Sequence, residues 1–356
     1  MSSGDKTLYV RPGVEQPADI RATGVRRRRR LSLSEYVEGI LRGDRIVLAR
    51  AITLIESSRA QDSELAQQIV DACLPKAGDS IRVGITGTPG AGKSTFIEAL
   101  GTYLIGKGER VAVLAVDPSS ERSGGSILGD KTRMERLANA EAAFIRPSPS
   151  GGSLGGVARR TRETMILCEA AGFRTVLIET VGVGQSETLV HGMVDFFLLL
   201  MIAGAGDELQ GIKRGIVEMA DLITINKADG TNVVAAESAR GEFARALHLF
   251  PARENGWVPD VVTCSAVTGR GIAELWDIVL HHRAQMQDSG WLDLNRRQQR
   301  HTWLREAVRN QLLEQFRHDE RVKALLPAVE QAVRDGELSP TRAAQTLIQR
   351  FRANAE

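Results

Sequence analysis

Apolar residues follow two different patterns of spacing along this chain, and the change from one pattern to the other divides the chain into segments. From residue 81 to about residue 284, short and continuous apolar runs alternate with stretches of helical period. Continuous runs are typical of parallel strands that are covered on both faces, whereas half-exposed strands alternate. Helices between parallel strands imply right-handed crossovers, so the pattern predicts an α/β fold with a mostly parallel, doubly wound sheet. The predicted strands are 81–86, 111–116, 143–146, 175–179, 195–202, 221–225 and 260–264.

Helical period without strand signals precedes this region. Ser34 and Asp44 are candidate N-caps for two helices, and a third helix is expected at 64–74. The residues before them are polar and contain two prolines. We therefore expect a disordered tail at 1–33, followed by a helical segment at 34–78.

The chain becomes helical again after the sheet region. One helix is predicted at 291–316 and a last one at 342–351. A helical extension of this length needs an apolar surface to cover it. It either folds back on its own domain or pairs with a second copy of the chain as a dimerisation arm, and the pattern leaves both open. The expected sheet domain is thus 79–284, and the expected C-terminal arm is 285–356.

Composition and charge are those of an ordinary soluble globular protein. Hydrophobic residues make up 42% of the chain and charged residues 25%, and the net charge is +2. This balance gives no drive toward nucleic acid or an anionic membrane, and we interpret the arginine run at 26–30 as a solvated or partner-facing stretch. The longest apolar run, at 196–203, is too short to span a bilayer, and no signal-peptide pattern is visible. A transit peptide is the alternative for the N-terminus, but its acidic residues disfavour it, so we expect a cytoplasmic protein.

Cysteine and histidine add little to this picture. The three cysteines, Cys73, Cys168 and Cys264, form no C-x-x-C pair, which favours a reducing compartment over a disulfide framework. His281 and His282 form the only histidine pair, and no cysteine or acid lies at a spacing suited to zinc. We interpret this pair as part of a helix surface.

The strongest chemical signal is a glycine-rich sequence between the strand at 81–86 and a predicted helix. Residues 87–94 read Gly-Thr-Pro-Gly-Ala-Gly-Lys-Ser, which fits the phosphate-binding loop G-x-x-x-x-G-K-[ST]. Its backbone N–H groups and the helix N-terminus attract a phosphate chain. We expect Lys93 to reach the β- and γ-phosphates and the Ser94 hydroxyl to ligate Mg²⁺. The candidate phosphate-binding residues are Gly87, Pro89, Gly90, Ala91, Gly92, Lys93, Ser94 and Thr95.

A second signal follows the strand at 221–225, where residues 226–229 match the N-K-x-D motif of GTP-binding proteins. Asp229 can accept hydrogen bonds from guanine N1–H and the N2 amino group, and adenine lacks that donor pair. We expect Asn226 to tie this loop to its neighbours and the Lys227 stem to cover the base. Residues after the last strand are expected to offer a backbone N–H to guanine O6. The candidate base-binding residues are Asn226, Lys227, Asp229, Ser265, Ala266 and Val267.

Acidic residues at other strand ends supply the hard oxygen ligands that Mg²⁺ prefers. Asp117 ends one strand and Asp130 lies in the glycine-rich stretch beyond it. The alternatives are that Asp117 only starts a turn and that Asp130 only caps a helix. Glu179 opens a Glu-Thr-Val-Gly sequence that matches the D-x-x-G switch of GTPases, with Glu in place of Asp. We expect the Gly182 N–H to sense the γ-phosphate, and Gln185 is a candidate for orienting water.

Together these segments resemble the MeaB/ArgK family of G proteins, which includes the human methylmalonic aciduria type A protein. The match runs from about residue 34 to residue 350. The resemblance implies a GTPase of the signal-recognition and MinD-like class that is homodimeric through its helical arm. It also implies a chaperone that uses GTP hydrolysis to gate cofactor loading and to protect an adenosylcobalamin-dependent acyl-CoA mutase. The segments that carry it are 87–95, 116–120, 129–134, 179–187, 206–213 and 226–229.

The resemblance assigns roles and partners as well. Lys213 looks like a third-switch lysine through which the mutase stimulates hydrolysis. The expected cofactor is Mg²⁺ with GTP or GDP, and no directly bound cobalamin is expected. Methylmalonyl-CoA mutase is the expected client, with isobutyryl-CoA and ethylmalonyl-CoA mutase as alternatives that the sequence leaves open. The adenosyltransferase of the mutase is a further candidate partner. The implied catalytic residues are Lys93, Glu179, Gln185 and Lys213, and the implied metal ligands are Ser94, Asp117, Asp130 and Glu179.

Two other classes share the phosphate loop. A small-molecule kinase or transport ATPase, the function that the name ArgK carries, has no use for Asp229. A metallochaperone GTPase for nickel enzymes is expected to carry a histidine- or cysteine-rich segment, which this sequence lacks. A nucleic-acid role rests on the arginine run at 26–30 alone.

Overall fold

The computed structural model describes residues 29–57, 59–116, 134–147, 154–180, 186–204 and 214–353 of the 356-residue chain. The chain divides into two compact units, Met1–Ser32 and Leu33–Glu356, and every described helix and strand lies in the second unit. Within the described residues, no helix is long and apolar enough to cross a membrane.

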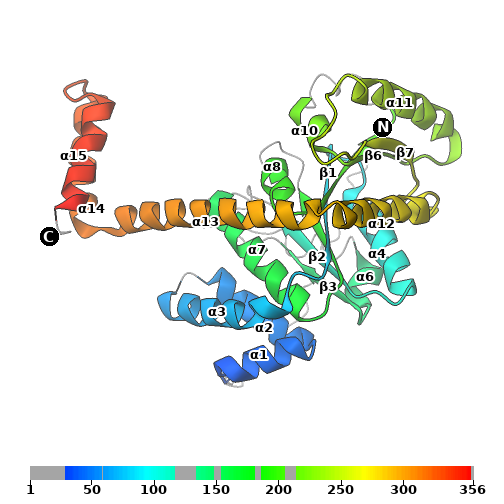
Figure 1. Ribbon diagram of the computed structural model, residues 1–356. Helices are drawn as coiled ribbons and strands as arrows, with labels where there is room; N and C mark the ends of the chain where they lie inside the picture. Colours follow the sequence, from blue (N-terminus) through cyan, green and yellow to red (C-terminus); the bar gives the residue numbers. More distant parts are fainter. Residues whose placement is uncertain are drawn as a thin grey trace, which may run out of the picture. The chain divides into compact units, whose positions relative to one another are not determined.

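A single parallel sheet organises the described part of the second unit (Figure 1). Its seven strands lie in the order β3-β2-β4-β1-β5-β6-β7, and every neighbouring pair is parallel. All seven predicted strands are confirmed, with each end within one residue of its expected place, as is the doubly wound α/β fold. The strands are β1 (Ile81–Gly87), β2 (Val111–Val116), β3 (Ala143–Arg146), β4 (Thr175–Thr180), β5 (Phe196–Ile202), β6 (Leu222–Asn226) and β7 (Asp260–Thr263).

Helices cover both faces of the sheet. Along β5, Leu198 and Leu200 pack into the core on one face, whereas Leu199 and Met201 pack into the core on the other. Burial on both faces explains why the strands read as continuous apolar runs. On the first face lie α4 (Lys93–Gly106), α6 (Glu135–Asn139) and α12 (Ile272–Asp288), and on the second lie α7 (Leu154–Ala170), α8 (Ser186–His191), α10 (Arg214–Met219) and α11 (Val233–Leu247).

Three helices precede the sheet and pack on one another and on α7. The Asp44 carboxylate caps the second of them, accepting the N–H groups of Ile46 and Val47 at 2.8 and 3.1 Å, as predicted. The first helix begins at Leu33, so Ser34 lies inside its first turn and is not the N-cap that the sequence suggested. The helices are α1 (Leu33–Leu41), α2 (Arg45–Glu56) and α3 (Ala60–Cys73), followed by the 3₁₀ turn η1 (Leu74–Lys76).

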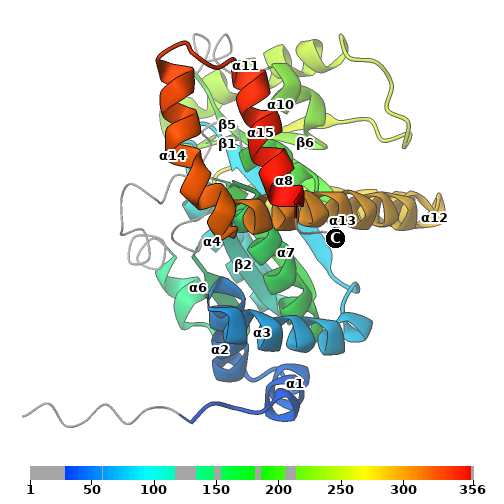
Figure 2. The same cartoon turned by 90° about the vertical axis from the view of Figure 1, so that its left-hand side faces the viewer.

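The C-terminal arm consists of α13 (Trp291–His318), α14 (Glu320–Arg334) and α15 (Pro340–Arg352). The first and last confirm the predicted helices at 291–316 and 342–351, each within two residues. Helices α14 and α15 lie side by side (Figure 2), and a small apolar core of their own holds them together. That core is made of Val322, Val329, Ala343 and Leu347.

The histidine pair in α12 differs from its expected role. His281 is exposed, but His282 is buried, with its ring 5.0 Å from that of Phe196 and 4.8 Å from that of Trp257. The interpretation as a helix surface is therefore wrong for His282. Burial lowers the pKa of His282 to about 4, so the ring packs as a neutral aromatic group.

Candidate functional site

The carboxyl ends of the seven strands meet at one edge of the sheet, and the predicted site residues follow those ends. The structure describes residues 87–95, Glu179, residues 226–229 and residues 265–267. Five predicted residues lie outside the described ranges, so their placement is not part of the site below. They are Asp117, Asp130, Gly182, Gln185 and Lys213.

Glycine is required at both ends of the phosphate loop, for different reasons. At the end of β1, a Cβ on Gly87 would lie 2.1 Å from the backbone oxygen of Leu200, so no side chain fits there. At the start of α4, Gly92 has φ 86°, a left-handed conformation that side chains disfavour, and a Cβ there would lie 2.9 Å from Asn226 Nδ2. The loop is thereby held against β5 on one side and against Asn226 on the other.

Lys93 lies within the curve of this loop. Its Nζ donates hydrogen bonds to the backbone oxygens of Gly87 at 2.9 Å and of Thr88 at 3.3 Å. Burial lowers the pKa of the Lys93 ammonium, and the nearby carboxylates of Glu179 and Glu187 act in the opposite direction. The loop thus holds a cation at the N-terminus of α4, which is where a polyphosphate chain binds in proteins of this kind.

Ser94 and Glu179 bring two oxygen donors together beside Lys93. The Ser94 hydroxyl, in the first turn of α4, donates to Glu179 Oε1 at the end of β4 over 3.2 Å. A hydroxyl and a carboxylate are the kind of ligands that Mg²⁺ prefers, so this pair fits the metal that the sequence predicts. Among the described residues, no group of three or more histidine, cysteine or acidic side chains is arranged to hold a metal ion. Ser94 and Glu179 are the described part of the predicted ligand set.

A single amide side chain connects the phosphate loop to the predicted base loop. Asn226 Nδ2 donates to the backbone oxygen of Ala91 at 2.8 Å. Its Oδ1 accepts the Ala266 N–H at 3.2 Å and lies 3.5 Å from the Cys264 thiol. This confirms the expectation that Asn226 ties its loop to the neighbouring loops. Cys264 was not predicted to take part, although its place directly before Ser265 was a signal for it.

The base loop itself is held in a strained conformation. Lys227 has φ 58°, and among the described residues it is the only one other than glycine with a positive φ. The Ser265 hydroxyl donates to Asp229 Oδ2, which fixes one oxygen of the carboxylate that is predicted to bind guanine. Residues 265–267 were expected to offer a backbone N–H to guanine O6. The Ala266 N–H donates to Asn226 Oδ1 instead, so it is not that donor in this arrangement.

Glu187 is a site residue that the residue-by-residue analysis missed. It lies in the first turn of α8 and is only 2% exposed. Its carboxylate is close enough to Lys93 to oppose the lowering of the lysine pKa. The available signal was its position at the end of the segment 179–187, eight residues after Glu179.

Comparisons with known proteins agree with this geometry. A family model described as "Methylmalonyl Co-A mutase-associated GTPase MeaB" matches residues 48–321, which include the sheet and the whole of the arm helix α13. GTPase ArgK of Escherichia coli (strain K12) is 50% identical over 309 residues, which cover 87% of this chain and 93% of that protein. The mitochondrial methylmalonic aciduria type A homolog of Mus musculus is 46% identical over 325 residues, covering 88% of this chain and 78% of that protein.

A solved structure extends the similarity to three dimensions. The crystal structure of a protein named LAO/AO transport system kinase matches this chain with a TM-score of 0.70 and 43% sequence identity. The match covers 89% of this chain and 96% of that one. The similarity therefore includes more than the phosphate loop and its strand.

Proposed function

Because this chain belongs to the MeaB family of methylmalonyl-CoA mutase-associated GTPases, we propose that it is a G-protein chaperone for an adenosylcobalamin-dependent acyl-CoA mutase. Its enzymatic activity is GTP hydrolysis. In the proposed role, hydrolysis gates the loading of the cofactor and protects the loaded mutase. The proposed client is methylmalonyl-CoA mutase, the enzyme in the family's description, and its adenosyltransferase is a further proposed partner. The cobalamin stays on those partners.

The main support for a nucleotide site is the pair of hydrogen bonds by which the Asn226 amide joins the phosphate loop to the base loop. In the proposed complex, Asp229 accepts hydrogen bonds from guanine N1–H and N2–H, and the Ser265 hydroxyl keeps its carboxylate in place. The Lys227 stem covers the base. Since Ala266 N–H is engaged by Asn226, we assign the contact with guanine O6 to the Val267 N–H.

The phosphate end is assigned in the same way. Lys93 binds the β- and γ-phosphates, and Ser94 and Glu179 hold Mg²⁺ with Asp117 and Asp130. When bound, Mg²⁺ neutralises charge on the phosphate oxygens. The residues of this chain position the phosphates and exclude other groups from contact with them. We further propose that Gly182 binds the γ-phosphate, Gln185 orients water and Lys213 makes hydrolysis responsive to the mutase.

An exposed apolar stripe on α13 supports a homodimer through the arm. Leu304, Val308 and Leu312 lie four residues apart and are 61%, 49% and 54% exposed. Apolar side chains repeated on one face of a helix are typical of a surface that packs against a second helix. We propose that a second copy of the chain covers this stripe.

The three cysteines are buried free thiols, which suit a reducing compartment. We therefore propose that the protein is located in the cytoplasm.

The chaperone role is tested by GTP hydrolysis with and without purified methylmalonyl-CoA mutase. We expect slow turnover by the protein alone and faster turnover with the mutase. Lys213→Ala is expected to keep the slow turnover and to lose the stimulation, whereas Lys107→Ala, an exposed lysine after α4, should behave as the wild type. Turnover that the mutase leaves unchanged in the wild-type protein would contradict the proposed client.

A kinase is the second candidate, because the similar solved structure is named a transport system kinase. Asp229 favours GTP over this alternative, since an ATP-dependent kinase gains nothing from a carboxylate aimed at N1–H and N2–H. Asp229→Asn should weaken GTP binding and strengthen XTP binding, because xanthine presents an oxygen where guanine has its amino group. A kinase would instead transfer the γ-phosphate to a small acceptor and release little free phosphate.

A further inference from the structure

One face of α13 binds the short turn that connects α8 to β5. Three side chains, roughly one for each helical turn, take part. Arg296 donates from Nε to Asp195 Oδ1 at 2.8 Å, and Gln299 donates from Nε2 to the Val194 oxygen at 2.8 Å. Trp303 donates from its indole nitrogen to the Gly192 oxygen at 3.0 Å. The turn at 192–195 is therefore held by side chains of the arm as well as by its own strand.

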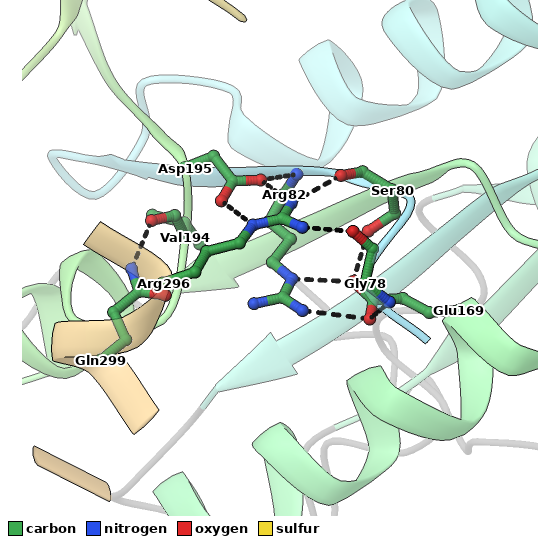
Figure 3. A network of polar contacts seen from close by, with 8 residues as sticks. All are labelled: Gly78, Ser80, Arg82, Glu169, Val194, Asp195, Arg296 and Gln299. Atoms are coloured by element: carbon green, nitrogen blue, oxygen red, sulfur yellow. Dashed lines mark hydrogen bonds and ion pairs between the residues drawn. The ribbon is translucent and has the colours of Figure 1, made fainter. Parts of the chain in front are cut away.

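The first of these contacts is part of a buried network of alternating charges at the foot of the sheet (Figure 3). Asp195 accepts hydrogen bonds from Nε and Nη2 of Arg296, and it also accepts the backbone N–H of Arg82 at 3.0 Å. The Arg82 guanidinium in turn donates to both oxygens of Glu169, at 2.7 and 3.0 Å. Arg296 adds a 2.7 Å bond to the Ser80 oxygen. A buried network of hydrogen-bonded charges of this kind orders the foot of the sheet.

The same turn is continuous with α8, and α8 lies directly on the strand that leads to the phosphate loop. Val190 and Val194 touch β1 at Gly84, where a Cβ would lie 2.9 and 3.1 Å from their side chains. The Gly192 N–H donates to the Thr188 oxygen at 3.1 Å, so the turn is hydrogen-bonded to the last turn of α8. The segment from Ser186 to Asp195 thus forms one short unit that packs on β1.

The opposite end of this unit faces the nucleotide site. Helix α8 contacts β1, which ends at Gly87 of the phosphate loop, and β4, which carries Glu179 at its end. Glu187 is buried in the first turn of α8, and its carboxylate acts against the lowering of the Lys93 pKa. The ten residues 186–195 therefore connect two sites. Glu187 lies at one end, and the turn at 192–195, to which α13 binds, lies at the other.

We propose that Gln299 and Trp303 of α13 are positioning residues for nucleotide binding, acting through α8 and Glu187. When their hydrogen bonds are present, the unit from residue 186 to residue 195 is ordered before the nucleotide arrives. When they are absent, part of the binding free energy is used to order it, so affinity falls. The coupling is reciprocal, and a partner that shifts α13 changes the affinity for nucleotide by the same factor.

The test uses the full-length protein and fluorescent GDP. Trp303→Phe removes the indole N–H but keeps a ring beneath the Arg162 guanidinium, which lies 5.2 Å from the Trp303 ring. We expect a 2- to 10-fold loss of GDP affinity, the range for one hydrogen bond. Gln299→Met, which removes the amide donor at similar volume, should lower the affinity in the same way. The exposed neighbour Thr302→Ala is the matched control and should bind GDP as the wild type does.

A double-mutant cycle separates positioning from a general loss of structure. In a Glu187→Gln background, we expect the effect of Trp303→Phe on GDP affinity to shrink at least twofold, because both changes act on one unit. A merely structural role would leave the two effects additive. Additive effects would overturn the route through α8, and an unchanged GDP affinity in both Trp303→Phe and Gln299→Met would overturn the proposal.

Discussion

Asn226 donates a 2.8 Å hydrogen bond from its side-chain nitrogen to the backbone oxygen of Ala91, and both residues are buried. The two are 135 positions apart in the chain. This bond makes the loop for the base and the loop for the phosphates a single structure. In the proposed nucleotide site, we expect the affinity for either end of a nucleotide to depend on this bond.

Removing that amide should weaken nucleotide binding strongly. Asn226→Ala leaves the Ala91 oxygen and the Ala266 N–H without their buried partner, and we expect GDP affinity to fall about 10- to 100-fold. The control is Asn232→Ala, which removes an exposed 2.8 Å bond to the Lys227 oxygen in the same loop and should cost less than about threefold. Titration with fluorescent GDP measures both. Equal losses in the two variants would contradict the special role of Asn226.

Close packing of α8 on β1 should make Gly84 intolerant of any side chain. A Cβ at this position would lie 2.8 to 3.1 Å from side-chain atoms of Phe197, Val190 and Val194. We expect Gly84→Ala to lower the free energy of unfolding by about 1–3 kcal/mol, measured by urea denaturation. Gly106→Ala is the matched control, since nothing lies within 4 Å of a Cβ there, and it should be neutral or up to about 1 kcal/mol more stable. A Gly84→Ala protein as stable as the control would rule out this packing.

The buried His282 should make the protein less stable in mild acid. Burial lowers the pKa of His282 to about 4, whereas the unfolded chain titrates near its ordinary value of 6.5. Between pH 7 and pH 5 the unfolded state therefore binds the proton first, which lowers the free energy of unfolding by about 2 kcal/mol. His282→Phe keeps a ring against Phe196 and Trp257 and should remove this loss.

Asp221 acts in the opposite direction in the same pH range. Burial raises its pKa to about 6, so the folded state takes up this proton first and gains stability as the pH falls. Both the wild type and His282→Phe keep Asp221, so the difference between their pH profiles reports on His282. Urea denaturation at pH 7 and pH 5 gives that difference. Parallel profiles would show that His282 does not titrate as a buried group.

The apolar stripe on α13 should control the oligomeric state. Val308→Asp places a charge at the centre of the stripe, between Leu304 and Leu312. Because Val308 is 49% exposed, we expect a loss of stability below about 1 kcal/mol but a shift from dimer to monomer in sedimentation velocity. Thr302→Asp adds the same charge to a different side of the helix and should leave the dimer intact. Wild-type and Val308→Asp proteins of equal mass would contradict the proposed interface.

Much of the fold and part of the site could be predicted from residue order alone. The seven strands were found because a parallel sheet buried on both faces requires uninterrupted apolar runs. The phosphate loop was found because its parts are contiguous, so that Lys93 bonds to Gly87 only six positions away. The prediction that His282 lies on a helix surface was wrong because it treated histidine as a polar residue. A neutral imidazole can pack between Phe196 and Trp257 as an aromatic ring does.

Contacts between distant segments were out of reach of such patterns. Asp195 and Arg296 are 101 positions apart, and Arg82 and Glu169 are 87 apart, yet both pairs meet at the foot of the sheet. They meet because β1 lies beside β5 and the arm helix crosses them, and strand order is selected by the burial of all seven strands together. A local pattern specifies which element a segment forms and which chemistry it carries. Which of those elements become neighbours, and so whether Asn226 reaches Ala91 or Trp303 reaches Gly192, depends on the packing of the whole chain.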